Sequence, residues 1–339
     1  MTDVATAAWA RSSGARKPGL ARLTGVAVVA LLMSLPLFLK SYHLGLATQV
    51  LIFAMLAMSI DVLAGFAGRT PLCHGAIFGT STYFVIYGTN TWALPLPVAF
   101  AVGIGAATVV AAVFALLAVR VTGVYFLLLT LALGLVVWGI CLRWTQVTGG
   151  ENGLRGDLRN GPLADPRALY ALVLVVSLTA FAAMRRCVSS PFGLTLRGIR
   201  DSESRMASMG YNVPLHVFMA FTVSGFFAGV AGAIYAVFNN FVSPSAVALA
   251  QSVQGLLMAI VGGIGTLIGS FVGSAVIILL EHVVSAYTER WQSVLGITFV
   301  LVMIFAPEGI IGRLRHLWQQ QHRSASTQTK PARPKEQVP

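Results

Sequence analysis

Residues 65–79 read GFAGRTPLCHGAIFG and interrupt two long apolar runs. The stretch holds four glycines, a proline, Arg69 and His74. Glycine adds backbone freedom and proline lacks the N–H that a helix needs, so both residues break helices. On either side, apolar residues continue without alternation for about 20 positions, which is the length of a helix that crosses a bilayer. The stretch therefore predicts a break between two membrane helices.

The whole chain shares the apolar character of these flanks. Its 339 residues are 56% hydrophobic and only 10% charged, whereas soluble domains carry about 25% charged residues. Too few polar groups remain to cover a surface in water, so lipid is the expected solvent. Backbone groups in lipid must be paired within helices or a closed barrel, and continuous apolar runs favour helices. The expected fold class is an all-α polytopic membrane protein.

Ten segments are candidate membrane helices, and eight crossings would also fit the pattern. The eighth and ninth form one run that is split by Gly262, Gly263 and Gly265, which we expect to act as a hinge. Whether residues 65–79 and 251–285 cross the membrane or re-enter it is left open. The first segment lacks a cleavage site and is expected not to be a signal peptide. The ten segments are 20–39, 43–64, 74–92, 94–119, 121–141, 168–184, 214–238, 251–266, 267–285 and 291–306.

Basic residues set the expected orientation. With ten crossings and a cytoplasmic N-terminus, all but six of the 23 lysines and arginines fall on the cytoplasmic side, so both termini are expected there. This distribution explains the net charge of +12 without nucleic acid, for which no aromatic-basic module is present. Residues 1–19 and 316–339 are expected to be basic, disordered tails around a membrane domain over 20–315, with the second tail against anionic lipid. The six outer residues are Lys40, Arg143, Arg155, Arg159, Arg167 and Arg290.

The longest cytoplasmic loop, residues 185–213, carries signals for two short helices. Ser190 and Pro191 are typical of one helix start, and Asp201 or Ser202 of another. Gly210 is expected to close the second helix in the left-handed conformation. The loop is interpreted either as a docking site or as a connection that lies on the lipid headgroups. The apolar residues that favour docking are Leu196, Ile199, Met206 and Met209.

Two ionisable residues lie within or beside the apolar runs. A carboxylate at mid-bilayer costs about 2.5–3.5 kcal/mol, so Asp61 is expected to face protein or a water-filled path unless it reaches surface water. His74 is interpreted as hydrogen-bonded packing or as part of a path, and no second metal ligand lies at helical spacing from it. On the outer side, Thr145–Gly156 is predicted to be a glycine-rich turn, although its glycines also permit close approach to another surface.

Motifs for enzymatic chemistry and nucleotide binding are absent from the sequence. No GxxxxGK[ST] phosphate loop, GxSxG or HExxH occurs, so the chain is expected neither to be an enzyme nor to hold a cofactor or metal. Cys73, Cys141 and Cys187 lack CxxC spacing, and the topology places Cys141 and Cys187 at opposite faces. A structural disulfide is therefore not expected.

Several stretches over residues 45–315, taken in order, resemble the permease subunits of ABC importers for branched-chain amino acids and related hydrophobic or amide solutes. At the break, Arg69, Pro71 and Cys73 depart from the polar amide and the small or apolar residues usual in that family. The matching stretches are SIDVLAGFAG, LCHGAIFGTSTY, VTGVYFLLLTLALG, VTGGENGL, SPFGLTLRGIRDSESRMASMGYNV, AGVAGAIYA, VSP, VGGIGTLIGSFVGS and FAPEGIIG.

This resemblance implies a multi-pass protein of the bacterial inner membrane that shares a translocation path with a second, different permease chain. Two ATPase subunits would hydrolyse ATP, and an extracytoplasmic binding protein would deliver the solute. Arg200, Glu203 and Gly210 would couple the chain to the ATPases. The residues expected to shape the path are Asp61, Gly65, Gly68, Arg69, His74 and Gly75.

Three alternatives to this reading stay open. The first is a proton-coupled secondary transporter that uses Asp61. The second is a permease of the same family for urea, short amides or aromatic acids. A membrane-embedded enzyme is the third, although no acid, base or metal constellation supports it.

Overall fold

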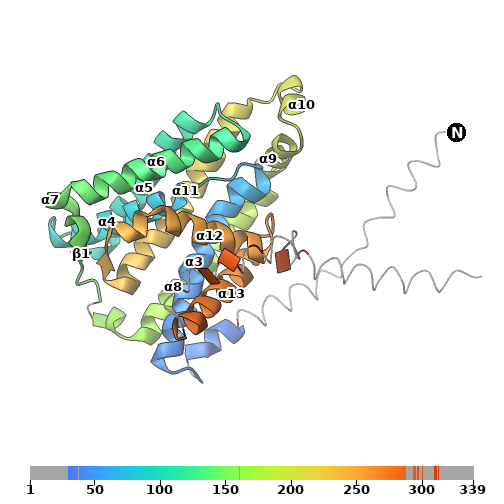
Figure 1. The fold of residues 1–339 in the computed structure, drawn as a ribbon. Coiled ribbons are helices and arrows are strands. Elements are labelled where there is room, and N and C mark those ends of the chain that lie inside the picture. Colours follow the sequence, from blue (N-terminus) through green and yellow to red (C-terminus); the bar gives the residue numbers. More distant parts are fainter. Residues whose placement is uncertain are drawn as a thin grey trace, which may run out of the picture.

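The computed structural model describes residues 30–36, 38–159 and 161–287, followed by a few positions between 293 and 312. Helices make up nearly all of this part of the chain, which confirms the all-α class (Figure 1). Both predicted tails, nearly all of segment 291–306 and the larger part of segment 20–39 lie outside the described residues.

The bounds of the eight longer helices agree with the second to ninth predicted segments to within a few residues. The short elements are the π-helical turn Val62–Phe66 directly after α3, the helices α7 (Thr145–Thr148), α9 (Pro191–Asp201) and α10 (Glu203–Ser208), and the 3-10 turns Gly150–Asn152, Gly161–Ala164 and Pro244–Val247. The longer helices are α3 (Ser41–Asp61), α4 (His74–Asn90), α5 (Leu96–Ala118), α6 (Gly123–Arg143), α8 (Pro166–Ser189), α11 (Val213–Asn239), α12 (Leu249–Gly262) and α13 (Leu267–Ser285).

Six of the described helices are long and apolar enough to cross a membrane: α3 with its π turn, α5, α6, α8, α11 and α13. The remaining two, α4 and α12, have 17 and 14 residues. At 1.5 Å per residue α12 is about 21 Å long, against roughly 30 Å of hydrocarbon. Segment 251–266 was expected to be long enough to cross, but the helix ends at Gly262, where the glycine-rich turn begins, and is preceded by non-helical chain. The total of ten crossings stays a prediction.

The connections between helices gather at two ends of the molecule. At one end, which we name the coupling-loop end, α9 and α10 lie beside the helix break and the α5–α6 turn (Figure 1, upper right). At the other, the sheet end, β1 (Leu154–Arg155) pairs antiparallel with β2 (Phe241–Val242). The Asn90 amide at the end of α4 donates to the Arg155 carbonyl at 2.6 Å there.

Contacts at the sheet end distinguish the two interpretations of Thr145–Gly156, a plain glycine-rich turn or a loop that approaches another surface closely. A Cβ on Gly153 would overlap the Val242 carbonyl, and Gly153 has φ +66°. The loop therefore makes a close approach to another segment and is more than a plain turn. Only glycine satisfies both the space and the backbone angle at this position.

The centre of the bundle is formed by α3, α4 and α11. Within the most apolar 18-residue stretch of each helix, 78% of the residues are buried in α3 together with its π turn and 67% in α11, but only 22% in α6. The α11 backbone passes so close to α4 that a Cβ on Gly232 would overlap the Phe78 carbonyl. Small residues permit this packing, and the outward faces of α5 and α6 are left to lipid or to a partner.

Candidate translocation and coupling site

The predicted helix break is present. After the π turn, residues 67–73 are non-helical and Gly68 adopts φ +69°. The Leu72 N–H donates to Thr130 Oγ1 at 3.1 Å, and a Cβ on Gly134 would lie 3.4 Å from the Leu72 carbonyl. Thr130 and Gly134 lie near the middle of α6. Residues 67–73 therefore turn back into the bundle, and α4 begins level with the middle of α6, about halfway through the bundle. Non-helical backbone at that depth is tolerated because it is buried in protein.

His74 lies at the start of α4 and is fully buried. Its Nε2 lies 2.6 Å from Ser224 Oγ, and Ser224 Oγ in turn donates to the Ser59 carbonyl. Because the hydroxyl proton is committed to Ser59, His74 Nε2 must be the donor, which leaves Nδ1 as an acceptor. Nδ1 has no partner among the described residues. The contacts favour the packing interpretation of His74, since its ring joins α3, α4 and α11.

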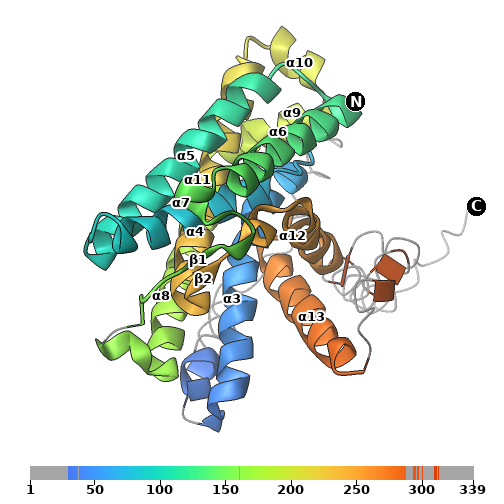
Figure 2. The same cartoon turned by 60° about the vertical axis from the view of Figure 1, so that its left-hand side comes forward.

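Gly75 brings the two short helices together. Its N–H donates to Ser252 Oγ at 2.8 Å, and a Cβ on Gly75 would lie 2.8 Å from the Ser252 backbone nitrogen. One turn further along α4, a Cβ on Gly79 would lie 2.8 Å from Val247 Cγ1. The first turns of α4 and α12 therefore meet inside the bundle. Figure 2 shows α12 and α13 next to α3.

Asp61 is fully buried, which fits the expectation that it faces protein or a path and excludes the alternative that it reaches surface water. Its Oδ1 accepts a hydrogen bond from the Gly265 N–H at 2.6 Å, and Oδ2 has no partner among the described residues. The Arg200 guanidinium donates to the Gly65 carbonyl one turn away. A Cβ on Gly65 would overlap Asp61 Oδ1 and lie 2.5 Å from the Gly265 nitrogen. These four residues, predicted as path, coupling and hinge residues, form one contact group.

The predicted hinge is a tight turn between α12 and α13. Gly263 has φ +119° and Gly265 has φ +80°, both in the region that favours glycine. Gly262 has no space for a side chain, because a Cβ there would overlap the Gly269 carbonyl. The turn is thus held by close packing on one side and by the Asp61 hydrogen bond on the other.

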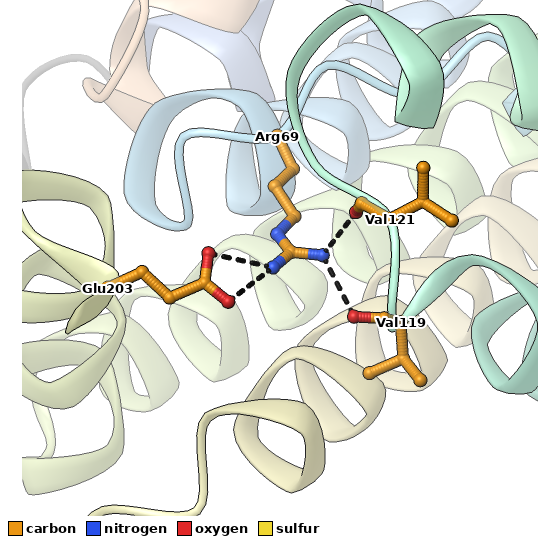
Figure 3. Close-up of polar contacts among 4 residues, drawn as sticks. All are labelled: Arg69, Val119, Val121 and Glu203. Atoms are coloured by element: carbon orange, nitrogen blue, oxygen red, sulfur yellow. Dashed lines mark hydrogen bonds and ion pairs between the residues drawn. The ribbon is translucent and has the colours of Figure 1, made fainter. Parts of the chain in front are cut away.

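Arg69 joins three connections at the coupling-loop end (Figure 3). Its Nη2 lies 3.1 Å from both carboxylate oxygens of Glu203, while Nη1 donates to the carbonyls of Val119 at 3.1 Å and Val121 at 2.8 Å. The Arg69 side chain is 5% exposed and that of Glu203 45%. The guanidinium therefore ties the helix break to the α5–α6 turn and to α10. Glu203, expected to meet an ATPase, is already bound within the chain.

The coupling loop forms the two predicted short helices. Ser190 precedes α9, and Ser202 caps α10 by accepting from the Arg205 N–H at 3.4 Å. Gly210 adopts φ +85°, as predicted, with open space around it. Gly68 packs on the same loop, since a Cβ added to Gly68 would lie 2.8 Å from Arg200 Cγ.

Of the four apolar residues that favoured the docking interpretation of this loop, three do not offer a surface for docking. Leu196, Ile199 and Met206 are buried within the chain, and Met209 alone is exposed, at 58%. The face they form packs against the α11 residues Val213 and Val217 and against the membrane helices. An apolar stripe shows that a face is buried, without showing what covers it.

Sequence reasoning missed several residues of this centre. Ser224 and Ser252 gave no signal, because a serine in an apolar helix is common. Glu281 in α13 was also missed, although it is a carboxylate inside the apolar segment 267–285. The argument applied to Asp61, that an acid in a membrane segment needs a partner, would have identified it.

Comparison with known proteins agrees with this geometry. The family model described as "Branched-chain amino acid transport system / permease component" matches residues 42–306, which include the break, the coupling loop and the hinge. Two relatives are the high-affinity branched-chain amino acid transport system permease proteins LivM of Escherichia coli (strain K12) and Salmonella typhimurium (strain LT2). Each is 25% identical over 322 aligned residues, which cover 86% of this chain and 75% of the relative. No solved structure matches significantly. The chain therefore belongs to the family of branched-chain amino acid transport permeases and is a multi-pass ABC transporter permease of the inner membrane.

Proposed function

We propose that this chain is a permease subunit of an ABC importer that moves branched-chain amino acids, or related small apolar solutes, into the cell. The family match over the membrane region carries the proposal. The contact groups around Asp61 and Arg69 support it, because they connect a peripheral loop directly to a broken membrane helix. Such a connection is what an energy-coupled permease needs.

Energy for transport comes from two ATPase subunits on separate chains, since the sequence has no phosphate loop. They bind at the coupling-loop end, where α9 and α10 lie and where Met209 is exposed. This end and both termini face the cytoplasm, in keeping with the distribution of basic residues. Movement of α9 would be transmitted through Arg200 to the Gly65 carbonyl, and movement of α10 through Glu203 to Arg69.

A second permease subunit, of different sequence, completes the path, and an extracytoplasmic binding protein delivers the solute at the sheet end. The exposed apolar faces of α5 and α6 offer surface for lipid and for that partner. Urea, short amides or aromatic acids remain alternative solutes, because the binding protein sets much of the selectivity.

ATP-driven uptake in proteoliposomes tests the proposal. The vesicles would contain this chain, its partner permease and the ATPases, with binding protein loaded in turn with labelled leucine, urea and an aromatic acid. We expect leucine to accumulate only with ATP. Glu203→Lys should abolish uptake, because it places an ammonium beside Arg69. Glu336→Lys near the C-terminus, which makes the same exchange away from both proposed docking ends, serves as the matched control. Uptake by this chain alone, driven by a proton gradient and blocked by Asp61→Asn, would instead establish the secondary transporter.

A further inference from the structure

A small cavity lies at the sheet end of the bundle, between the starts of α3 and α8 and the end of α11. Its volume is about 100 Å³, several-fold above the ~10–15 Å³ that one water molecule needs. Among the described residues, Arg159 is the only charged one in its wall. The rest of the wall is mostly apolar and includes Leu163, Leu169 and Phe238, while Ser41 and Thr48 contribute hydroxyl groups.

The Arg159 guanidinium is held in place by the last turn of α11. Its Nε donates to the Val237 carbonyl at 3.1 Å and its Nη2 to the Phe238 carbonyl, and its carbon lies 5.8 Å from the centroid of the Phe238 ring. The preceding backbone is fixed as well, because the Leu158 N–H donates to Asn240 Oδ1 at 3.1 Å. The two side-chain bonds use two of the five N–H groups of the guanidinium, and the other three have no partner among the described residues. Arg159 therefore offers donors to a ligand from a position that is already fixed, which lowers the entropic cost of binding.

Basic residues gather around this cavity although they are scarce on the outer side. Of the six that are expected there, Arg159 lines the cavity, and Lys40 and Arg167 each adjoin a lining residue in sequence. Lys40 and Arg167 are both exposed. Asp165 at the start of α8 offsets part of this charge and accepts from the Arg167 N–H at 2.9 Å. Basic side chains on the outer side run against the usual bias of membrane proteins, and a bound anion would explain why half of them gather here.

A phosphate group that continues into an apolar molecule suits this cavity best. Phosphate oxygens accept the N–H groups of a guanidinium in a charge-assisted geometry. The apolar part of the wall favours a ligand with hydrocarbon attached over a free ion. An amino acid fits less well, because the described wall offers no carboxylate for its ammonium group. Membrane helices start and end beside the cavity, which places it at the level of lipid headgroups.

We propose that the cavity binds the phosphate group of a membrane phospholipid. The Arg159 guanidinium is its charged partner, and the lipid's glycerol and upper acyl groups pack on Leu163, Leu169 and Phe238. The site lies apart from the residues of the proposed path, and the inference goes beyond the proposed function. A bound lipid would join α3, α8 and α11 at their outer ends.

Lipid titration of the full-length chain tests the site. The delipidated chain in detergent would be titrated with phosphatidylglycerol, and bound lipid would be measured by native mass spectrometry. We expect phosphatidylglycerol to bind about tenfold or more tightly than diacylglycerol, which lacks the phosphate. Arg159→Gln should weaken phosphatidylglycerol binding about tenfold or more, the scale of one hydrogen bond between charged groups. Arg143→Gln, the same exchange at an exposed position at the outer end of α6, should leave binding unchanged. Equal affinities of Arg159→Gln and Arg143→Gln would overturn the proposal.

A second variant separates lipid binding from the role of Arg159 in holding the end of α11. Gly45 lines the cavity, and a Cβ added to it has nothing within 4 Å. Gly45→Leu therefore fills space in the cavity and leaves Arg159 with its two carbonyl partners. We expect this variant to lose phosphatidylglycerol binding as Arg159→Gln does, without a lower unfolding temperature in the absence of lipid. Wild-type binding by Gly45→Leu would show that Arg159 acts only through the fold, and would overturn the site.

Free anions are the other source of oxygen acceptors for Arg159. Leucine and inorganic phosphate would each be added in excess to the chain with phosphatidylglycerol bound. Retention of the lipid in both cases supports the phospholipid assignment. Displacement by leucine would assign the cavity to the carboxylate of the solute, and displacement by inorganic phosphate would assign it to a free ion. Either displacement would overturn the proposal.

Discussion

Alanine in place of Gly65 is expected to destabilise the folded protein by about 3–5 kcal/mol. The new Cβ would overlap Asp61 Oδ1 and lie 2.5 Å from the Gly265 nitrogen, so it would push between the two partners of a buried hydrogen bond. Loss of a hydrogen bond to a charged group costs about 1.5–3 kcal/mol, and extra volume in a packed core adds about 1–3 kcal/mol.

Gly45→Ala is the matched control, since it makes the same exchange in α3 where nothing lies within 4 Å of the added Cβ. Alanine is a better helix former than glycine, so this variant should gain about 0.5–1 kcal/mol. Both unfolding free energies would be measured by denaturant titration of the purified protein in mixed detergent micelles. Leucine uptake of the two variants would be compared in the reconstituted complex, where Gly65→Ala alone should lose activity.

Equal unfolding free energies for Gly65→Ala and Gly45→Ala would refute this reasoning. A double variant provides a sharper check, because Asp61→Ala vacates the space that the Gly65→Ala methyl needs. The two changes should then be non-additive by at least about 1 kcal/mol. Simple additivity would show that the methyl group does not meet the carboxylate.

Four other variants test the contacts described above. Arg69→Ala should cost about 3–5 kcal/mol of unfolding free energy, since it leaves two carbonyls and Glu203 without their donor. Glu203→Gln should cost less than about 1 kcal/mol because its side chain is 45% exposed, and equal costs would contradict the burial of the guanidinium. Ser224→Ala should cost about 1–3 kcal/mol by breaking the chain from His74 to Ser59, measured against Ser208→Ala on the exposed surface of α10. Asp61→Asn should only reduce leucine uptake, because the amide oxygen can still accept from the hinge; complete loss would favour proton coupling.

Local signals in the sequence predicted much of this architecture. Glycine and proline located the break at residues 65–79 and the hinge at Gly263 and Gly265, and capping residues located α9 and α10. These features depend on backbone freedom and on hydrogen bonds within a few residues, which the local sequence encodes.

The partners of these elements could not be predicted in the same way. Arg69 and Glu203 are 134 positions apart, and Asp61 and Gly265 are 204 positions apart. Hydropathy identifies which segments are apolar and does not say which of them lie side by side. The same limit explains the error at Leu196, Ile199 and Met206, where burial was expected against a partner and occurs within the chain.

The short length of α12 has a consequence for how the protein is made. A 14-residue helix cannot reach across the hydrocarbon, so it gains little from entering lipid by itself. Its first turn is met by Gly75 of α4, a segment synthesised long before it. Membrane insertion of α12 should therefore wait until α3, α4 and α11 have assembled. In chains whose α3, α4 or α11 cannot pack, α12 would leave the ribosome without the protein surface that holds it in the membrane.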